Sequence, residues 1–100
     1  MPKLLTPEQI QQNLSELEFN WEVREDRLVI EVETQNFTDA LWLVNEAGQV
    51  AEELSHHPNL AIHDYKFVTI ATTTHSSSGI TAKDFSLAER IDAVISRVGK

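Results

Sequence analysis

The 100-residue chain contains no cysteine, which excludes disulfide bonds, thiolate metal sites and cysteine nucleophiles. No apolar run approaches the roughly 20 residues that a membrane-spanning helix needs, and the N-terminal segment lacks the apolar core of a signal peptide. Basic residues are scarce: eight Lys and Arg oppose sixteen Asp and Glu, giving a net charge of −8 that repels the phosphate backbone of nucleic acids. We therefore expect a cytoplasmic protein with neither a membrane nor a nucleic-acid partner.

Glycine and proline are also few, at three residues each, and no low-complexity linker or internal repeat divides the chain. Its length predicts a single domain over residues 1–100. Hydrophobic residues make up 41% of the chain and charged residues 24%, which is typical of a globular protein. No phosphate-binding glycine motif and no G-x-S-x-G motif is present, so a nucleotide-binding fold and a serine hydrolase are both disfavoured.

Two capping boxes mark the starts of the first and last helices. Thr6 and Gln9 have the spacing of one box, which predicts a helix that ends near Leu17. Thr81 and Asp84 have the same spacing before an apolar stripe near the C-terminus. This capping role is a sufficient structural explanation for Asp84 taken by itself.

A longer helix is predicted between these two. Asn36 is its cap, and the helix should end near Leu54 or Ser55 because Pro58 cannot continue it. Apolar residues at helical spacing predict its buried face, and they are Phe37, Ala40, Leu41, Val44, Ala47, Ala51 and Leu54.

Strict alternation of apolar and polar residues predicts strands elsewhere. Segments 19–24 and 28–33 flank a turn at Glu25–Asp26 and predict a hairpin, with Phe19, Trp21 and Val23 on its buried face. Residues 60–75 look extended, and 59–64 are the candidate for a short fourth strand. The predicted order is α-β-β-α-β-α, an α+β sandwich with helices packed on one face of the sheet.

All four histidines fall within twenty residues, at His56, His57, His63 and His75. Imidazole exchanges protons near neutral pH, so the cluster indicates a proton-transfer or binding site. Glu52 lies one helical turn before the adjacent pair, where its carboxylate can orient a ring. The alternatives are solvated surface histidines and a metal site. The metal site is disfavoured because adjacent side chains diverge in an extended chain and no H-E-x-x-H pattern occurs.

The motif residues together resemble the pterin-4a-carbinolamine dehydratases over nearly the whole chain. The residues that carry the resemblance are Glu52, His56, His57 and Pro58 in the pattern E-x-x-x-H-H-P, followed by Tyr65, His75, the segment 79–81 and Asp84. The resemblance implies a four-stranded antiparallel sheet with helices on one face. It also implies the dehydration of 4a-hydroxytetrahydropterin to quinonoid dihydropterin without a cofactor, a step in tetrahydrobiopterin recycling.

The same resemblance implies site roles and an assembly. Catalysis is expected from His56, His57 and His75, and substrate binding is expected from Glu52, Pro58, Tyr65 and Asp84. The expected assembly is a homodimer or homotetramer, consistent with apolar residues on both sides of the strand that follows Tyr65. The alternative function is that of a non-catalytic dehydratase-like binding or assembly factor, such as a RuBisCO assembly factor.

One spacing departs from the family pattern. Six residues separate Pro58 from Tyr65, where the family usually has five. An additional residue in a paired strand produces a bulge. We therefore expect a bulge in this segment, close to the site.

Overall fold

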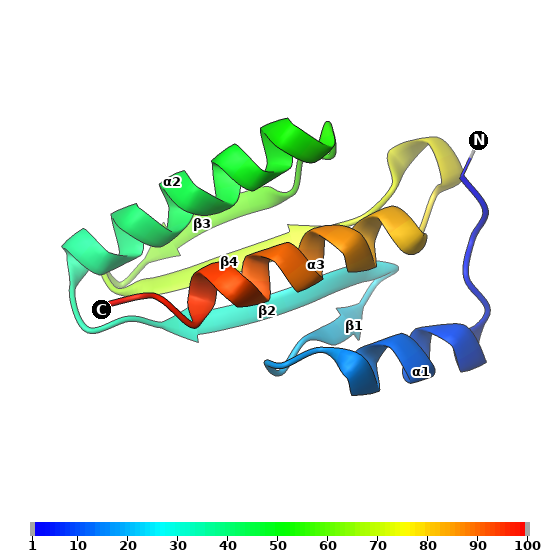
Figure 1. Cartoon of the computed structure of the whole chain (residues 1–100), viewed down its shortest axis with the longest axis horizontal. Coiled ribbons are helices and arrows are strands. Elements are labelled where there is room, and N and C mark those ends of the chain that lie inside the picture. Colours follow the sequence, from blue (N-terminus) through cyan, green and yellow to red (C-terminus); the bar gives the residue numbers. More distant parts are fainter. Residues whose placement is uncertain (1, 100) are drawn as a thin grey trace.

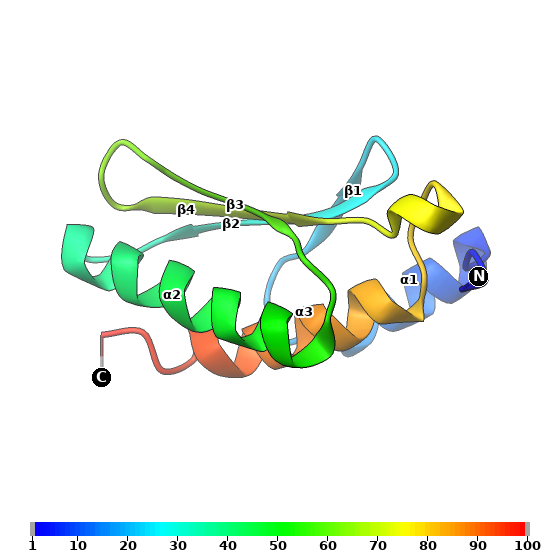
Figure 2. The same ribbon diagram turned by 90° about the horizontal axis from the view of Figure 1, so that it is seen from above.

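The computed structural model describes residues 2–99 and contains one four-stranded antiparallel sheet in the order β1-β2-β4-β3 (Figure 1). Figure 2 shows the helices on one side of the sheet. The elements in chain order are α1 (Pro7–Glu16), β1 (Glu22–Arg24), β2 (Arg27–Glu33), α2 (Phe37–Leu54), β3 (Asn59–His63), β4 (Phe67–Thr72), the 3-10 helix η1 (His75–Ser77) and α3 (Ala82–Ile95). The predicted α+β class and element order are confirmed.

Local hydrogen bonds explain where the helices begin and end. At α1 the Thr6 hydroxyl accepts from the backbone N–H of Gln9, and the Gln9 side chain accepts from the backbone N–H of Thr6. At α2 the Asn36 side chain accepts from the backbone N–H of Asp39. Helix α2 ends at Leu54, and its C-cap residue Ser55 has a left-handed backbone (φ 52°) that turns the chain toward β3. The predicted helix starts are therefore confirmed.

Helices α2 and α3 cover the sheet, but α2 is rotated relative to its predicted stripe. Phe37 and Leu41 are 49% and 42% exposed, so their predicted burial is wrong. Leu43 and Val50 face the core instead, alongside the alanines that the pattern did identify. Apolar residues on α2 exceed what one face can bury, and helical periodicity alone cannot choose between two overlapping stripes.

The predicted first strand is longer than the observed one. Strand β1 contains only Glu22–Arg24, and Val23 is 41% exposed rather than buried. Trp21 is buried, as expected, but its indole Nε1–H donates to Asp92 Oδ1 on α3 at 2.7 Å. Asp92 Oδ2 also accepts from the backbone N–H of Glu18 at 2.8 Å. These bonds to α3 account for the irregular backbone before β1.

The extended segment predicted over residues 60–75 is two strands and a 3-10 helix. Asp64 and Tyr65 both have left-handed backbones, with φ values of 47° and 55°, and they form the turn between β3 and β4. The pairing runs without interruption from Asn59↔Ala71 to His63↔Phe67, so the expected bulge is absent. No glycine or proline marks this turn, which is why the alternation concealed it.

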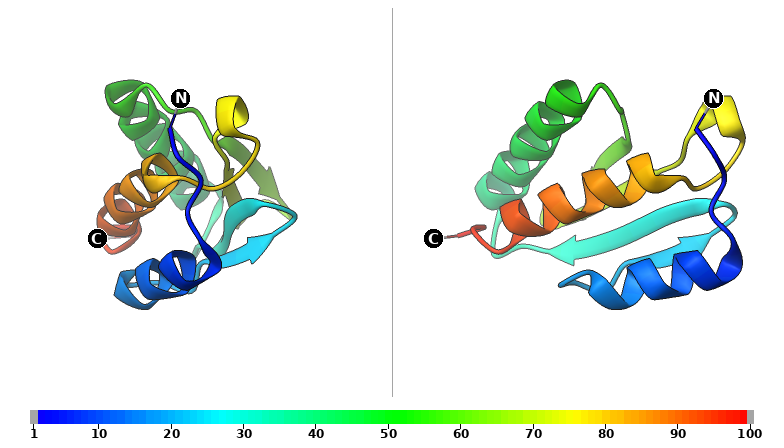
Figure 3. Two further views of the ribbon diagram at one scale, coloured as in Figure 1. Left: turned by 90° about the vertical axis from the view of Figure 1, so that its right-hand side faces the viewer. Right: turned by 45° about the vertical axis from the view of Figure 1, so that its right-hand side comes forward.

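The N-terminal segment holds the loop between β4 and α3 in place. The backbone N–H of Leu5 donates to the carbonyl of Ile80 at 3.1 Å, and the Ser77 hydroxyl donates to the carbonyl of Pro2 at 2.5 Å. Figure 3 shows this segment crossing beside η1. The first residues of the chain thereby restrain the loop that carries His75. Within residues 2–99 no helix has both the length and the apolar character required to cross a bilayer.

Candidate active site

Three chain segments converge at one end of the sheet. The C-terminal end of α2, the end of β4 with η1, and the N-terminal end of α3 all lie on the same side of the molecule (Figure 1). His56 and His57 follow Ser55, the C-cap of α2, and His75 opens η1. Loops at the end of a sheet are where a rigid scaffold commonly presents reactive side chains.

The centre of this region is the side chain of Asp84, which is fully buried. Its Oδ1 lies 2.7 Å from His56 Nε2 and accepts from the Thr72 hydroxyl at 2.7 Å. Its Oδ2 accepts from the Thr74 hydroxyl at 2.8 Å and from the backbone N–H of Thr81 at 2.9 Å. The capping role of Asp84 is confirmed, and it accounts for only the last of these four contacts.

This network satisfies a charge that would otherwise be costly to bury. Hydrogen bonds to an ionised acceptor are short and stronger than neutral ones, which agrees with the distances around Asp84. Within residues 2–99 no buried side-chain nitrogen or oxygen lacks a hydrogen-bond partner. Asp84 therefore joins the end of β4, the start of α3 and the loop after α2 into one rigid unit.

His57 also pairs with a carboxylate, but in a different environment. Its Nε2 contacts Oε2 of Glu52, and the two side chains are 64% and 76% exposed. Water screens an exposed pair of this kind. Glu52 and His57 are therefore neighbours, as expected from the sequence. Their exposed contact restrains the His57 ring far less than Asp84 restrains the ring of His56.

His75 is connected to His56 by way of the same carboxylate. It directly follows Thr74, whose hydroxyl is bonded to Asp84, while His56 is bonded to the other oxygen of that group. The His75 side chain is exposed to solvent. The structure thus brings His56, His57, His75, Glu52 and Asp84 to one end of the sheet.

Two other residues named in the sequence analysis lie differently. Pro58 joins His57 to the start of β3 and is half-buried. Tyr65 is 61% exposed on the β3–β4 turn, at the opposite end of β4 from His75. Lys66 lies over its ring at 5.9 Å, and the hydrogen bond and charge of Glu33 raise the pKa of Lys66. Within one chain Tyr65 therefore lies away from His56, His57 and His75.

His63 is the histidine that lies outside the site. Its Nε2 is 2.8 Å from the hydroxyl of Thr69, and its ring stacks on Phe67 with the ring centroids 5.8 Å apart. Glu31 Oε2 on β2 lies 3.4 Å from the same nitrogen. Clustering in the sequence grouped four histidines, but β3 carries His63 to the end of the sheet opposite His56 and His57, and the antiparallel β4 returns the chain to His75.

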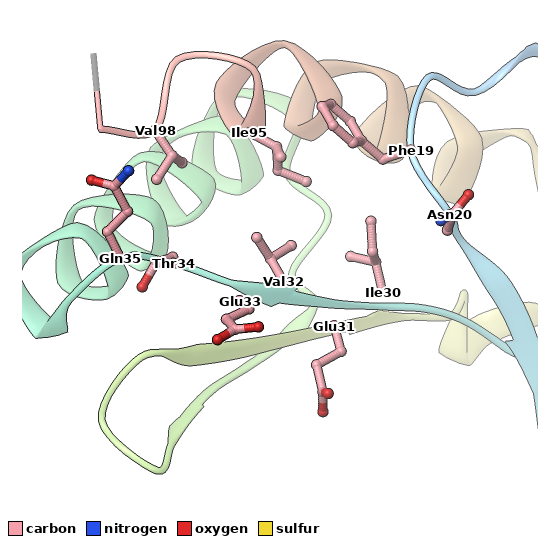
Figure 4. Close-up of a pocket in the computed structure, with 10 residues that line it drawn as sticks. All are labelled: Phe19, Asn20, Ile30, Glu31, Val32, Glu33, Thr34, Gln35, Ile95 and Val98. Carbon is pink, nitrogen blue, oxygen red and sulfur yellow. The ribbon is translucent and has the colours of Figure 1, made fainter.

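A cavity of about 390 Å³ lies elsewhere, between β2 and the C-terminal part of α3 (Figure 4). Its lining includes Phe19, Val32, Ile95 and Val98, and none of the four histidines. The candidate site is therefore identified by its chemistry and hydrogen bonding, and this cavity does not mark it.

Sequence reasoning missed the roles of Thr72 and Thr74. Both are buried, and both bond to Asp84. The signal available in the sequence was the alternation along the strand, in which every second residue points inward. Thr72 and Thr74 continue the inward side after Val68 and Ile70, so their hydroxyls point into the core. Buried hydroxyls require partners, so this pattern indicates a hydrogen-bond acceptor near the end of the strand.

No three His, Asp or Glu side chains converge in the described part of the chain in a way that could hold a metal ion. What the site does contain is one fully buried carboxylate paired with a half-buried imidazole, with two exposed imidazoles at the same end of the sheet. This arrangement defines a small α+β protein equipped for acid–base chemistry at the end of its sheet.

Comparison with known proteins identifies the family. The family model described as pterin 4 alpha carbinolamine dehydratase matches residues 3–94, and the chain belongs to this family. A relative from Trichodesmium erythraeum is 37% identical over 94 residues, covering 94% of this chain and 99% of the relative. One from Aquifex aeolicus is 34% identical over 100 residues, covering 100% and 99%. Both carry the name "Putative pterin-4-alpha-carbinolamine dehydratase".

Two solved structures show the same architecture. A transcriptional coactivator/pterin dehydratase from Brucella melitensis superposes with a TM-score of 0.86 at 25% identity, covering 93% of this chain and 99% of that chain. A pterin dehydratase-like protein identified as a RuBisCO assembly factor in the alpha-carboxysome gives a TM-score of 0.62 at 15% identity, covering 77% and 88%. The second likeness concerns the fold alone.

Proposed function

We propose that this protein is a 4a-hydroxytetrahydropterin dehydratase that works by histidine acid–base catalysis. The observation that supports this most is the pairing of half-buried His56 with fully buried Asp84, at the end of the sheet that also carries His57 and His75, in a chain of the pterin dehydratase family. A protein that acts only as an assembly scaffold has no need of a buried carboxylate that orients an imidazole. The catalytic function is therefore preferred to that of an assembly factor.

The reaction requires two proton movements. The bond between C4a and its hydroxyl oxygen breaks, the electron pair leaves with the oxygen, and a proton from an acid converts the leaving group to water. The lone pair of the adjacent ring nitrogen forms a C=N double bond, and a base removes the proton from that nitrogen. Each transfer by a positioned side chain contributes about 10²–10⁴-fold to the rate.

We assign these movements to separate imidazoles. The exposed His75 delivers the proton to the leaving hydroxyl, and His56 accepts the ring N–H proton. His57, with Glu52 beside it, positions the pterin and shares in proton transfer. Afterwards His75 has lost one proton and His56 has gained one, so exchange with water restores both. Neither a cofactor nor a metal takes part in this scheme, and Pro58 and Tyr65 stay predictions as substrate contacts.

The direct test is a dehydration assay on freshly generated 4a-hydroxytetrahydropterin. We expect the purified protein to accelerate formation of the quinonoid product well above the rate in buffer, and to do so equally after dialysis against EDTA. A rate equal to that in buffer contradicts the proposed function. Loss of the rate on chelation, with recovery on adding zinc, contradicts the metal-free scheme.

We also propose that the protein is a homo-oligomer, as a dimer or tetramer. Phe37 and Leu41 expose large apolar side chains on the outer side of α2, four residues apart on one helix face. Contiguous exposed apolar side chains are typical of interaction surfaces, and closed symmetry is the usual outcome for identical chains. Light scattering at micromolar concentration should give a mass of two or four chains. A mass near 11.3 kDa contradicts the proposal.

A further inference from the structure

We propose that Thr72 and Thr74 are positioning residues that hold His56 in the tautomer protonated on Nε2, so that Nδ1 is the nitrogen that takes the proton from the pterin. The catalytic half of this statement rests on the proposed function. The tautomer and its dependence on the two hydroxyls are properties of the folded protein and are measurable without substrate.

The hydrogen bonds around Asp84 have a definite direction. A threonine hydroxyl carries one hydrogen, and an ionised carboxylate can only accept. The Thr81 hydroxyl lies 3.2 Å from the backbone N–H of Lys83, from which it accepts, and 2.8 Å from the hydroxyl of Thr74. The consistent arrangement is donation from Thr81 to Thr74 and from Thr74 to Asp84, while Thr72 donates directly.

The proton between Asp84 and His56 can belong to either partner. Two arrangements satisfy a separation of 2.7 Å: Nε2–H donating to a carboxylate, or a protonated carboxyl donating to a bare Nε2. Three donors besides His56 converge on Asp84, namely the hydroxyls of Thr72 and Thr74 and the backbone N–H of Thr81. Donors bind a carboxylate more strongly than a neutral carboxyl, so they select the first arrangement.

The other ring nitrogen of His56 is Nδ1. His56 is half-buried, and within residues 2–99 no group forms a hydrogen bond with its Nδ1. No buried side-chain nitrogen in that range is without a partner, so Nδ1 retains contact with solvent. With Nε2–H committed to Asp84, Nδ1 presents its lone pair outward and serves as the base.

The exposed pair of His57 and Glu52 can be compared with the His56–Asp84 pair in the same protein. His57 also contacts a carboxylate through Nε2, but Glu52 is 76% exposed and the bond competes with water. We therefore expect one tautomer for His56 and a mixture for His57.

The test uses protein labelled with ¹⁵N-histidine and long-range ¹H–¹⁵N correlation spectra at alkaline pH, where imidazole is neutral. Wild-type His56 should show a protonated Nε2 and a bare Nδ1. In the double variant Thr72→Val with Thr74→Val, which removes both hydroxyls at nearly constant volume, the two tautomers should mix and kcat should fall about tenfold with little change in KM. The variant Thr72→Ser with Thr74→Ser should restore the tautomer and the rate.

Thr34→Val is the matched control, because it removes a buried hydroxyl that bonds to backbone carbonyls away from the site. It should leave the His56 spectrum unchanged. A wild-type spectrum with a protonated Nδ1 overturns the inference, as does an unchanged tautomer in the valine double variant. If that variant does not fold, Thr72→Val alone is read in the same way. A protein that shows the expected tautomers but does not dehydrate the pterin refutes the proposed function instead.

Discussion

Replacing His75 by alanine is expected to lower kcat for pterin dehydration by about 100-fold or more, and replacing His56 and His75 together is expected to lower it further. In the proposed mechanism each imidazole carries one of the two proton transfers, and a positioned acid or base contributes about 10²–10⁴-fold. The His75 side chain is exposed, so its removal creates no cavity in the core and the fold should persist. The measurement is a steady-state assay of dehydration, with circular dichroism to confirm folding.

His63→Ala is the matched control for this experiment. It removes the same side chain from the same fold, but from the face of the sheet where His63 stacks on Phe67. Its kcat should stay within a factor of two or so of wild type, since His63 touches none of the proposed catalytic groups. A rate unchanged in the double variant His56→Ala with His75→Ala would refute the proposed site.

Replacing Asp84 by asparagine is expected to reduce the free energy of unfolding by roughly 1–3 kcal/mol and to lower the dehydration rate. A helix cap alone would tolerate asparagine well. Here all four contacting groups donate, two to each oxygen. Asparagine replaces one oxygen with an NH₂ group, which sets donors against donors in a fully buried position. Denaturant unfolding measures the loss of stability.

Asp92→Asn separates the structural effect from the catalytic one. Asp92 is likewise buried on α3 and accepts from Trp21 Nε1 and the backbone N–H of Glu18, but it contacts no histidine. This variant should also lose stability while retaining the specific activity of its folded fraction. Equal specific activity in the folded fractions of Asp84→Asn and Asp92→Asn would show that Asp84 has no role beyond holding the fold.

Much of the local structure was predictable because its causes lie within a few residues. The capping boxes at Thr6 and Thr81 and the cap at Asn36 set the helix starts through bonds spanning two or three positions. Alternation identified β2 and the inward side of β4, where Val68 and Ile70 are fully buried. The turn between β3 and β4 was not predictable in this way, because Asp64 and Tyr65 adopt left-handed backbones without a glycine or proline signal.

The candidate site was likewise predictable only in part. The sequence alone is enough to establish the α+β order, the acidic and cysteine-free composition, and the presence of His56, His57 and His75 in a family-like pattern. The packed fold was needed to show which carboxylate each imidazole meets, that His63 lies apart, and that Thr72 and Thr74 belong to the network. The reason is physical: His56 and Asp84 are 28 residues apart, and their contact exists only because α2, β4 and α3 pack with their ends together. Because Asp84 is buried, losing any one of its hydrogen-bond donors is costly, and this burial arises only when the fold is packed.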